Sequence, residues 1–186
     1  MRRQTQHGMT LIELVVFIVI VSVALAGVLT VLNITVMHSG DPMIRKQMLA
    51  IAEALLEEVQ TKSFTYCDPT DANAATASSP AGCATTSEAM GPEGTETRIN
   101  ATTPFNNVND YYLVPVLASP ITNITGTSTA PAGYSASIEI AAENLNDIVS
   151  NSTPATMNAL RITVTVSHGG DSLAIEGYRT RYQPNF

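Results

Sequence analysis

The N-terminal part of the sequence contains one long apolar run without a charged side chain. No Asp, Glu, Lys or Arg occurs from Leu14 to Gly40, and most of residues 14–37 are apolar. About 20 apolar helical residues are enough to cross the hydrocarbon core of a membrane. The run is longer than the apolar part of a secretory signal peptide, and no small-residue cleavage site precedes a polar mature start. We therefore predict a transmembrane helix within residues 9–40, with a buried core helix as the alternative.

A second helical pattern follows the apolar run. Its apolar residues recur three or four positions apart and form one stripe, which consists of Ile44, Met48, Ile51, Leu55 and Val59. This spacing predicts an amphipathic helix over residues 41–62 that continues the transmembrane helix. Together the two would form a rod of roughly 50 residues, about 75 Å long. Glu53, Glu57 and Glu58 lie mainly off the stripe, so we interpret them as a solvated helix face.

Alternating apolar and polar residues dominate the C-terminal part of the chain. Residues 134–140 and 160–166 both show this period of two, which is typical of strands with one buried face. Residues 168–171, His-Gly-Gly-Asp, predict a turn, and "SLAIEGYRTRY" predicts the returning strand of a hairpin. The apolar stripe of the amphipathic helix is available to cover the sheet.

The region between the helices and these strands is rich in Gly, Pro, Ser and Thr, so residues 64–103 predict loop. A short strand is expected around Tyr111–Leu117. Residues 63–186 together predict a globular β domain. The fold class is therefore α+β, with a long N-terminal helix packed on a small C-terminal antiparallel sheet.

The charge of the chain is acidic, with a formal net value of −7. Such a chain has no sequence-wide attraction for phosphate backbones, which disfavours general nucleic-acid binding. Arg2 and Arg3 precede the apolar run, and mostly acidic sequence follows it. By the positive-inside rule we expect a cytoplasmic N-terminus in the inner membrane and a periplasmic or extracellular C-terminal domain.

The chain has two cysteines, Cys67 and Cys83, in a segment rich in Asp, Pro, Ser and Gly. Neither has a CxxC partner or a nearby His, so zinc and thioredoxin-like chemistry are poorly supported. If the domain lies outside the cytoplasm, a disulfide that closes this loop is expected. The alternative is a pair of free thiols in a mobile loop.

Glu13 stands at the start of the apolar run, where a carboxylate entering hydrocarbon costs about 2.5–3.5 kcal/mol. The surrounding stretch "GMTLIELVVFIVIV", after a short basic leader, resembles the class III leader of type IV prepilins and of type II secretion pseudopilins. The resemblance implies that prepilin peptidase cleaves the Gly8–Met9 bond and methylates Met9, so that residues 1–8 form the leader and Glu13 becomes the fifth mature residue. Met9 departs from the Phe that the family usually has there. The implied fold is pilin-like.

Cleavage would leave a positive α-amine on Met9, inside the membrane or a filament. In a helical stack of subunits the Glu13 carboxylate of one copy could neutralise the amine of its neighbour, which offsets the cost of burying either charge. The alternative is an interfacial Glu13 that points back to the lipid headgroups. The implied partners are prepilin peptidase, other major and minor pilins, and the inner-membrane assembly platform.

Further stretches are similar to minor pilins of the mannose-sensitive-haemagglutinin pilus group, namely "IAEALLEEV", the two-cysteine loop, "FNNVNDY" and "AIEGYRTRY". This resemblance implies a minor pilin that is first held in the membrane and then enters an extracellular filament. Two alternatives remain, a type II secretion pseudopilin and a single-pass anchored binding domain that never polymerises.

No constellation in the sequence predicts catalysis, because the histidines are scattered and no Ser or Cys nucleophile has a partner by spacing. We expect no enzyme activity and no cofactor. Oxygen-bearing side chains could hold calcium, although their spacing matches no EF-hand and such residues are ordinary turn formers. These candidates are Asp68, Asp71, Asn73, Asn107, Asn109 and Asp110.

Overall fold

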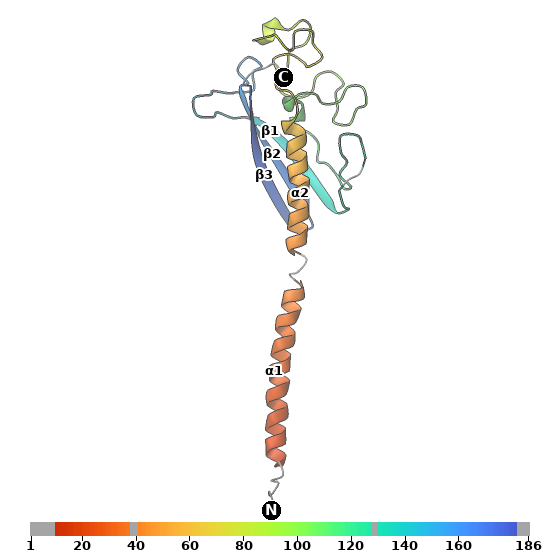
Figure 1. Cartoon of the computed structure of the whole chain (residues 1–186), viewed down its shortest axis with the longest axis vertical. Helices are drawn as coiled ribbons and strands as arrows, with labels where there is room; N and C mark the ends of the chain where they lie inside the picture. Colours follow the sequence, from red (N-terminus) through yellow and green to blue (C-terminus); the bar gives the residue numbers. More distant parts are fainter. Residues whose placement is uncertain (1–9, 38–40, 128–129, 182–186) are drawn as a thin grey trace, which may run out of the picture. The chain divides into compact units, whose positions relative to one another are not determined.

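The computed structural model describes residues 10–37, 41–127 and 130–181 (Figure 1). The chain divides into two compact units, residues 1–44 and residues 45–186. The predicted cleavage and methylation positions, Gly8 and Met9, lie outside the described residues. So do residues 38–40, which means that a continuous rod stays a prediction.

The first helix, α1, spans Leu11–Met37 and contains the predicted transmembrane run. Its residues Leu11–Thr30 are long and apolar enough to cross a membrane. Two polar side chains within it are satisfied by its own backbone, because Ser22 Oγ donates to Ile18 O at 2.7 Å and Thr30 Oγ1 donates to Ala26 O at 2.8 Å. Backbone and polar groups without water must find such internal partners, which suits a helix in lipid.

The second helix, α2, spans Asp41–Gln60 and carries the predicted apolar stripe. Met48, Leu55 and Val59 are buried, and Ala52 joins them on the same face. Pro42 lies in the first turn of α2, where its missing N–H costs no intrahelical hydrogen bond. The prediction of an amphipathic helix is confirmed.

Three antiparallel strands form one sheet in the order β1-β2-β3 (Figure 1). They span Tyr134–Ala142 (β1), Ala159–His168 (β2) and Asp171–Thr180 (β3). The predicted hairpin is present, with His168 opposite Asp171 and Gly169 at a φ of 60°, which favours glycine. Together with the helices, this sheet makes the fold α+β and pilin-like, as expected.

The helix α2 packs on the sheet within the second unit (Figure 1). Gly177 of β3 is the position of closest approach, because a Cβ built there would lie 2.5 Å from Gln60 Nε2 and 2.9 Å from Leu56 Cδ1. At another point Tyr134 of β1 donates its hydroxyl to the Gln47 side chain on α2. The side of α2 that carries Gln47, Leu56 and Gln60 therefore lies against the sheet.

The predicted strand at Tyr111–Leu117 is wrong. The segment begins at the end of a short 3₁₀ helix, Val108–Tyr111 (η2), and then makes a single bridge from Leu117 to Ala136 of β1. A capping box explains the helix, because Asn107 accepts a hydrogen bond from Val108 N while Asp110 accepts from the backbone of Asn107. Leu113, at a φ of 58°, then breaks any extended path.

Candidate functional site

The first turn of α1 is organised by Thr10. Its carbonyl oxygen accepts from Leu14 N at 3.2 Å, and its hydroxyl oxygen accepts from Glu13 N at 3.4 Å. Thr10 thus acts as a helix cap for the segment that holds Glu13. The Glu13 side chain is exposed in the first turn of α1, where the positive end of the helix dipole favours a carboxylate.

The surface of α1 is apolar on all sides. The exposed fractions of Leu11, Phe17 and Leu29 are 81%, 61% and 65%, and residues 11–30 are all exposed. A helix that is apolar around its whole circumference is stable only within a membrane or among other apolar helices. The helix therefore needs a surrounding that the described parts of this chain do not supply.

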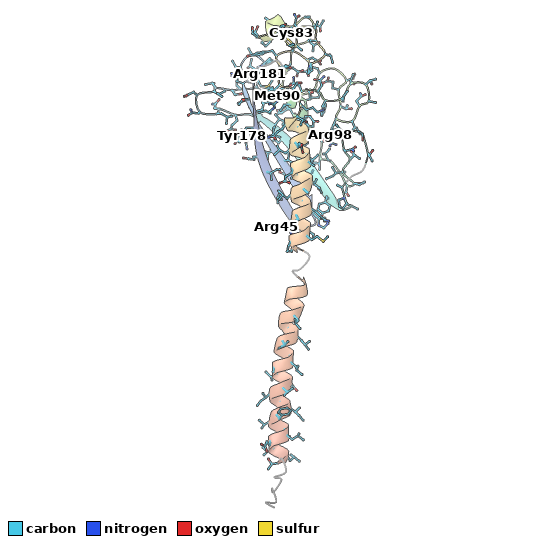
Figure 2. The ribbon with its side chains drawn as sticks, in the orientation of Figure 1. Arg45, Cys83, Met90, Arg98, Tyr178 and Arg181 are labelled. Atoms are coloured by element: carbon cyan, nitrogen blue, oxygen red, sulfur yellow. A yellow bond between two sulfur atoms is a disulfide. The ribbon has the colours of Figure 1, made fainter. Side chains whose placement is uncertain are left out.

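The two-cysteine loop is closed by the predicted disulfide between Cys67 and Cys83. Figure 2 labels Cys83 among the loops, far along the domain from Arg45. The carboxylate of Asp71 organises the loop from inside, because it accepts hydrogen bonds from the backbone amides of Asn73, Ala84, Thr85 and Thr86. These bonds hold the pKa of Asp71 well below its usual range. Asp71 and Asn73 are thus occupied as turn formers.

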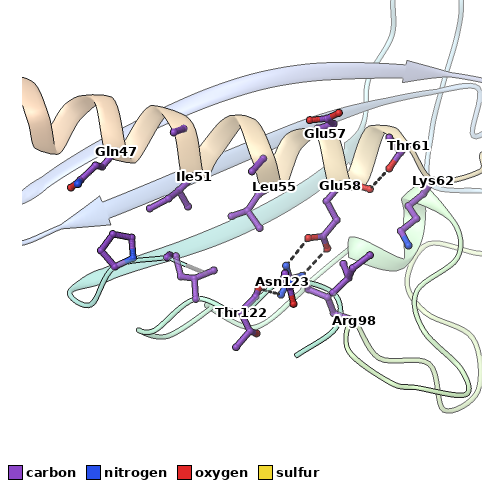
Figure 3. Close-up of a pocket in the computed structure, with 16 residues that line it drawn as sticks. Gln47, Ile51, Leu55, Glu57, Glu58, Thr61, Lys62, Arg98, Thr122 and Asn123 are labelled. Carbon is purple, nitrogen blue, oxygen red and sulfur yellow. Dashed lines mark hydrogen bonds and ion pairs between the residues drawn. The ribbon is translucent and has the colours of Figure 1, made fainter. Parts of the chain in front are cut away.

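Glu58 is not part of a solvated helix face, which corrects the sequence interpretation. Its carboxylate receives two hydrogen bonds from Arg98, one from Nε at 2.8 Å and one from Nη2 at 2.6 Å (Figure 3). The Tyr111 hydroxyl donates to the same carboxylate at 2.9 Å, and burial beside Glu58 raises the pKa of Tyr111 well above its usual range. Arg98 is buried and Glu58 is mostly buried, with side-chain exposures of 6% and 11%.

The same ion pair lines a groove beside α2 with a volume of about 660 Å³. Figure 3 shows Gln47, Ile51 and Leu55 of α2 on one side of it and Thr122 and Asn123 on the other. The guanidinium of Arg98 also donates from Nη1 to Thr122 O at 2.9 Å. Arg98 therefore ties the wall of the groove to α2.

A cluster of buried carboxylates lies elsewhere in the loops. Ligand oxygens of Glu88, Glu93 and Asp110 all lie within 4.8 Å of one another. Burial, together with neighbouring carboxylates, raises the pKa of Glu88 to about 9 and that of Asp110 to about 7. Burial likewise raises the pKa of Glu93, and it raises that of Glu96 to about 7.

Sequence reasoning found only part of this cluster. Among the calcium candidates, Asp110 belongs to it and Asn109 contacts it, whereas Asn107 caps η2 and Asp68 accepts from Thr70. It missed Glu88, Glu93 and Glu96. Three glutamates within nine residues of a loop that lacks apolar periodicity were the available signal.

Comparison with known proteins bears on the N-terminal helix. The family described as "Prokaryotic N-terminal methylation motif" matches residues 3–29. No curated protein and no solved structure matches the chain. This match supports a type IV pilin-like class III signal peptide at the N-terminus of the chain. The motif implies processing by prepilin peptidase and assembly with other pilins, and α1 fits single-pass membrane anchoring.

Proposed function

We propose that this chain is a minor pilin, a non-catalytic subunit that prepilin peptidase processes and that then joins or initiates a type IV pilus. One observation carries the proposal. The methylation motif at residues 3–29 overlaps a helix whose side chains from Leu11 to Thr30 are all exposed and mostly apolar. Membrane lipid before assembly and neighbouring helices after assembly would both cover that surface.

The proposed topology places the N-terminus in the cytoplasm and residues 45–186 in the periplasm. Arg2 and Arg3 before the span support this orientation by the positive-inside rule. The Cys67–Cys83 disulfide supports it independently, because disulfides persist in oxidising compartments such as the bacterial periplasm.

The proposed role of Glu13 is to pair with the α-amine of Met9 on a neighbouring subunit. In an apolar helical stack, each of these charges would be costly alone, and their pairing offsets much of that cost. Glu13 is exposed in the first turn of α1, a position from which a side chain can contact another chain. The assembly platform of the inner membrane is the further proposed partner.

The proposed subtype is a minor pilin of the mannose-sensitive-haemagglutinin group, on the likeness of "IAEALLEEV", "FNNVNDY" and "AIEGYRTRY". A type II secretion pseudopilin is the alternative within assembly systems. An anchored binding domain that never polymerises is the alternative outside them. Filament recovery and processing separate the three.

Mass spectrometry of the mature N-terminus tests the processing step. We expect the wild-type chain to begin at N-methyl-Met9, and a Gly8→Leu variant to keep its leader. Gly27→Ala is the matched control, because an added Cβ at Gly27 meets no atom within 4 Å. An intact Met1 in the wild-type chain would overturn the proposal in favour of a simple anchor.

Quantitative mass spectrometry of sheared surface filaments tests whether the chain is a minor subunit of the filament. A minor pilin should be recovered with the filaments in far fewer copies than the main subunit. Recovery as the main subunit contradicts the minor role. Retention of the processed chain in the membrane, with secretion lost on deletion, supports the pseudopilin instead.

A further inference from the structure

The carboxylate cluster of Glu88, Glu93 and Asp110 has no part in the proposed assembly of α1. The cluster lies in the loops of the second unit, and its members come from two segments, 88–93 and 110. All three side chains offer oxygen atoms, and no His or Cys belongs to the group. We propose that these residues bind a calcium ion that fastens the two loop segments together.

The spacing of the oxygens suits one calcium ion. Calcium–oxygen distances are about 2.3–2.6 Å, so two ligands on opposite sides of one ion lie about 5 Å apart. The ligand oxygens of the three carboxylates all fall within 4.8 Å of one another. Each pair of these oxygens therefore lies within the separation that two ligands of one calcium ion can have.

In each carboxylate of the cluster, one oxygen accepts a hydrogen bond and the other oxygen accepts none from the described part of the chain. Glu88 Oε2 accepts from Asn109 Nδ2 at 2.5 Å, Glu93 Oε1 accepts from Ala89 N at 2.9 Å, and Asp110 Oδ2 accepts from Asn107 N at 2.7 Å. Within the described residues, the second oxygens have no hydrogen-bond partner although they are buried; they are Glu88 Oε1, Glu93 Oε2 and Asp110 Oδ1. Donors thus orient the carboxylates, and the remaining oxygens are left to a cation or to a proton shared between Glu88 and Glu93.

Further unpaired oxygens lie on neighbouring residues. Asn109 is fully buried, and its Oδ1 has no partner within the described chain while its amide nitrogen holds Glu88 in place. Glu96, like the three carboxylates of the cluster, has one oxygen with a donor and one without. Its Oε1 accepts a hydrogen bond from Asn106 Nδ2 at 2.7 Å, and its Oε2 is unpaired in the described residues. A buried polar atom without a partner is costly, and it therefore requires an explanation. A cation supplies one, because it needs acceptors only.

The charges of the cluster also favour a cation. Glu88 and Asp110 are fully buried, and Glu93 lies beside them. The nearby Arg181 acts on Glu88 through its charge, but its guanidinium lies over the rings of Phe64 and Tyr66 and donates to Pro154 O. A divalent ion would displace the protons that burial favours on these carboxylates and would offset the charge of their ionised forms. Neighbouring carboxylates that share protons are the competing arrangement.

Calcium fits this donor set better than other divalent ions do. Oxygen-only ligands from flexible loops are typical of calcium, whereas zinc and copper prefer nitrogen or sulfur. Magnesium requires ligands at about 2.0–2.1 Å in near-ideal octahedral geometry and keeps several waters. By analogy with extracellular modules we expect a dissociation constant of about 10⁻⁴–10⁻³ M.

The test uses the full chain in detergent micelles, freed of metal with a chelator, at neutral pH. Calcium chloride is added during calorimetric titration and thermal unfolding. We expect one bound ion per chain and a melting temperature that rises with calcium concentration. The absence of both effects up to about 10 mM calcium would overturn the proposal in favour of shared protons. An equal response to magnesium would overturn the choice of calcium.

Two variants assign the effect to the cluster. Glu93→Gln keeps an oxygen that accepts from Ala89 N but loses a charge, so we expect calcium affinity to fall about tenfold or more. Glu88→Gln replaces a carboxyl group that burial keeps protonated without calcium, so this variant should melt no lower than the wild type in the absence of calcium, while its response to calcium is lost. Glu139→Gln on β1 is the control, because Glu139 is exposed and outside the cluster. A calcium response that survives in both variants, or falls equally in the control, contradicts the assignment.

A luminescence measurement covers the case in which a variant unfolds. Terbium replaces calcium at oxygen sites, and tyrosine sensitises its emission. Tyr111 directly follows Asp110, and the chain has no Trp. We expect terbium emission from the wild-type chain that calcium displaces. Emission that calcium leaves unchanged would overturn the proposal.

Discussion

Arg98 and Glu58 form a two-pronged ion pair, with Arg98 Nε 2.8 Å from Glu58 Oε1 and Nη2 2.6 Å from Oε2. The two residues lie 40 positions apart in the sequence, one in a loop and one on α2. Tyr111 adds a third hydrogen bond to the same carboxylate. The pair therefore fastens the loop region to the helix that covers the sheet.

Loss of one partner of this pair should be costly. We expect Arg98→Ala to lower the free energy of unfolding by about 3–5 kcal/mol, because Glu58 would remain buried without its counter-charge. Arg161→Ala is the control, because the ion pairs of Arg161 with Glu143 and Glu176 are more exposed, and its loss should cost much less. Denaturant unfolding of the full chain measures both. Equal losses in the two variants would contradict the structural role of the buried pair.

A side chain at Gly177 should separate α2 from the sheet. We expect Gly177→Ala to destabilise the domain by about 1–3 kcal/mol, because the new Cβ would lie 2.5 Å from Gln60 Nε2. The ends of Gln60 and Leu56 are flexible, so Gly177→Val should cost more than Gly177→Ala. Gly170→Ala is the matched glycine control, because no atom lies within 4 Å of its added Cβ. Thermal unfolding ranks the three, and a stable Gly177→Val would disprove the close packing.

Asp71 should make stability depend on pH at the acidic end. Its pKa is depressed in the folded chain, so the unfolded chain binds more protons there and stability rises with pH. The contribution of Asp71 is fully present above the unfolded pKa of about 3.9 and is lost as pH falls below it. Asp71→Asn should flatten this part of the curve relative to the wild type.

The free energy of unfolding is measured in urea from about pH 2 to about pH 6. This interval extends about two pH units on each side of the pKa of aspartate in the unfolded chain. Asp147→Asn is the control, since Asp147 is exposed. The wild type and Asp71→Asn could instead lose stability in parallel below about pH 4, which is close to the unfolded pKa of aspartate. That result would show that the hydrogen bonds from the backbone amides to Asp71 do not organise the loop.

Glu13 should govern entry into filaments rather than processing. The hydrogen bond to Thr10 comes from the backbone amide of residue 13, so Glu13→Leu keeps the helix cap. We expect normal cleavage but about tenfold or lower recovery in sheared filaments, equivalent to about 1.4 kcal/mol or more. Glu13→Gln should show a similar loss, because it also removes the charge. Wild-type recovery of both variants would show that charge pairing at this position is dispensable.

Local sequence pattern was enough to predict the regular elements of this chain. The apolar run predicts α1, the spacing of Met48, Leu55 and Val59 predicts the buried face of α2, and strict alternation predicts β2. These signals are local, because helix and strand periods place neighbouring residues on one face wherever the chain goes. The sequence likewise predicted the disulfide between the two loop cysteines, since the chain has only these two.

Tertiary structure alone decided the roles of the polar residues in the loops. The position of Glu58 in the helical pattern predicts a solvated glutamate. In the fold, however, Arg98 and Tyr111, which are distant in sequence, donate hydrogen bonds to its carboxylate. Glu88 and Asp110 are 22 positions apart, and only the loop path brings their carboxylates together. Irregular loops have no fixed period that relates sequence distance to spatial distance. The sequence thus determined the helices, the sheet and the processing motif, whereas the fold of the loops determined which charges meet.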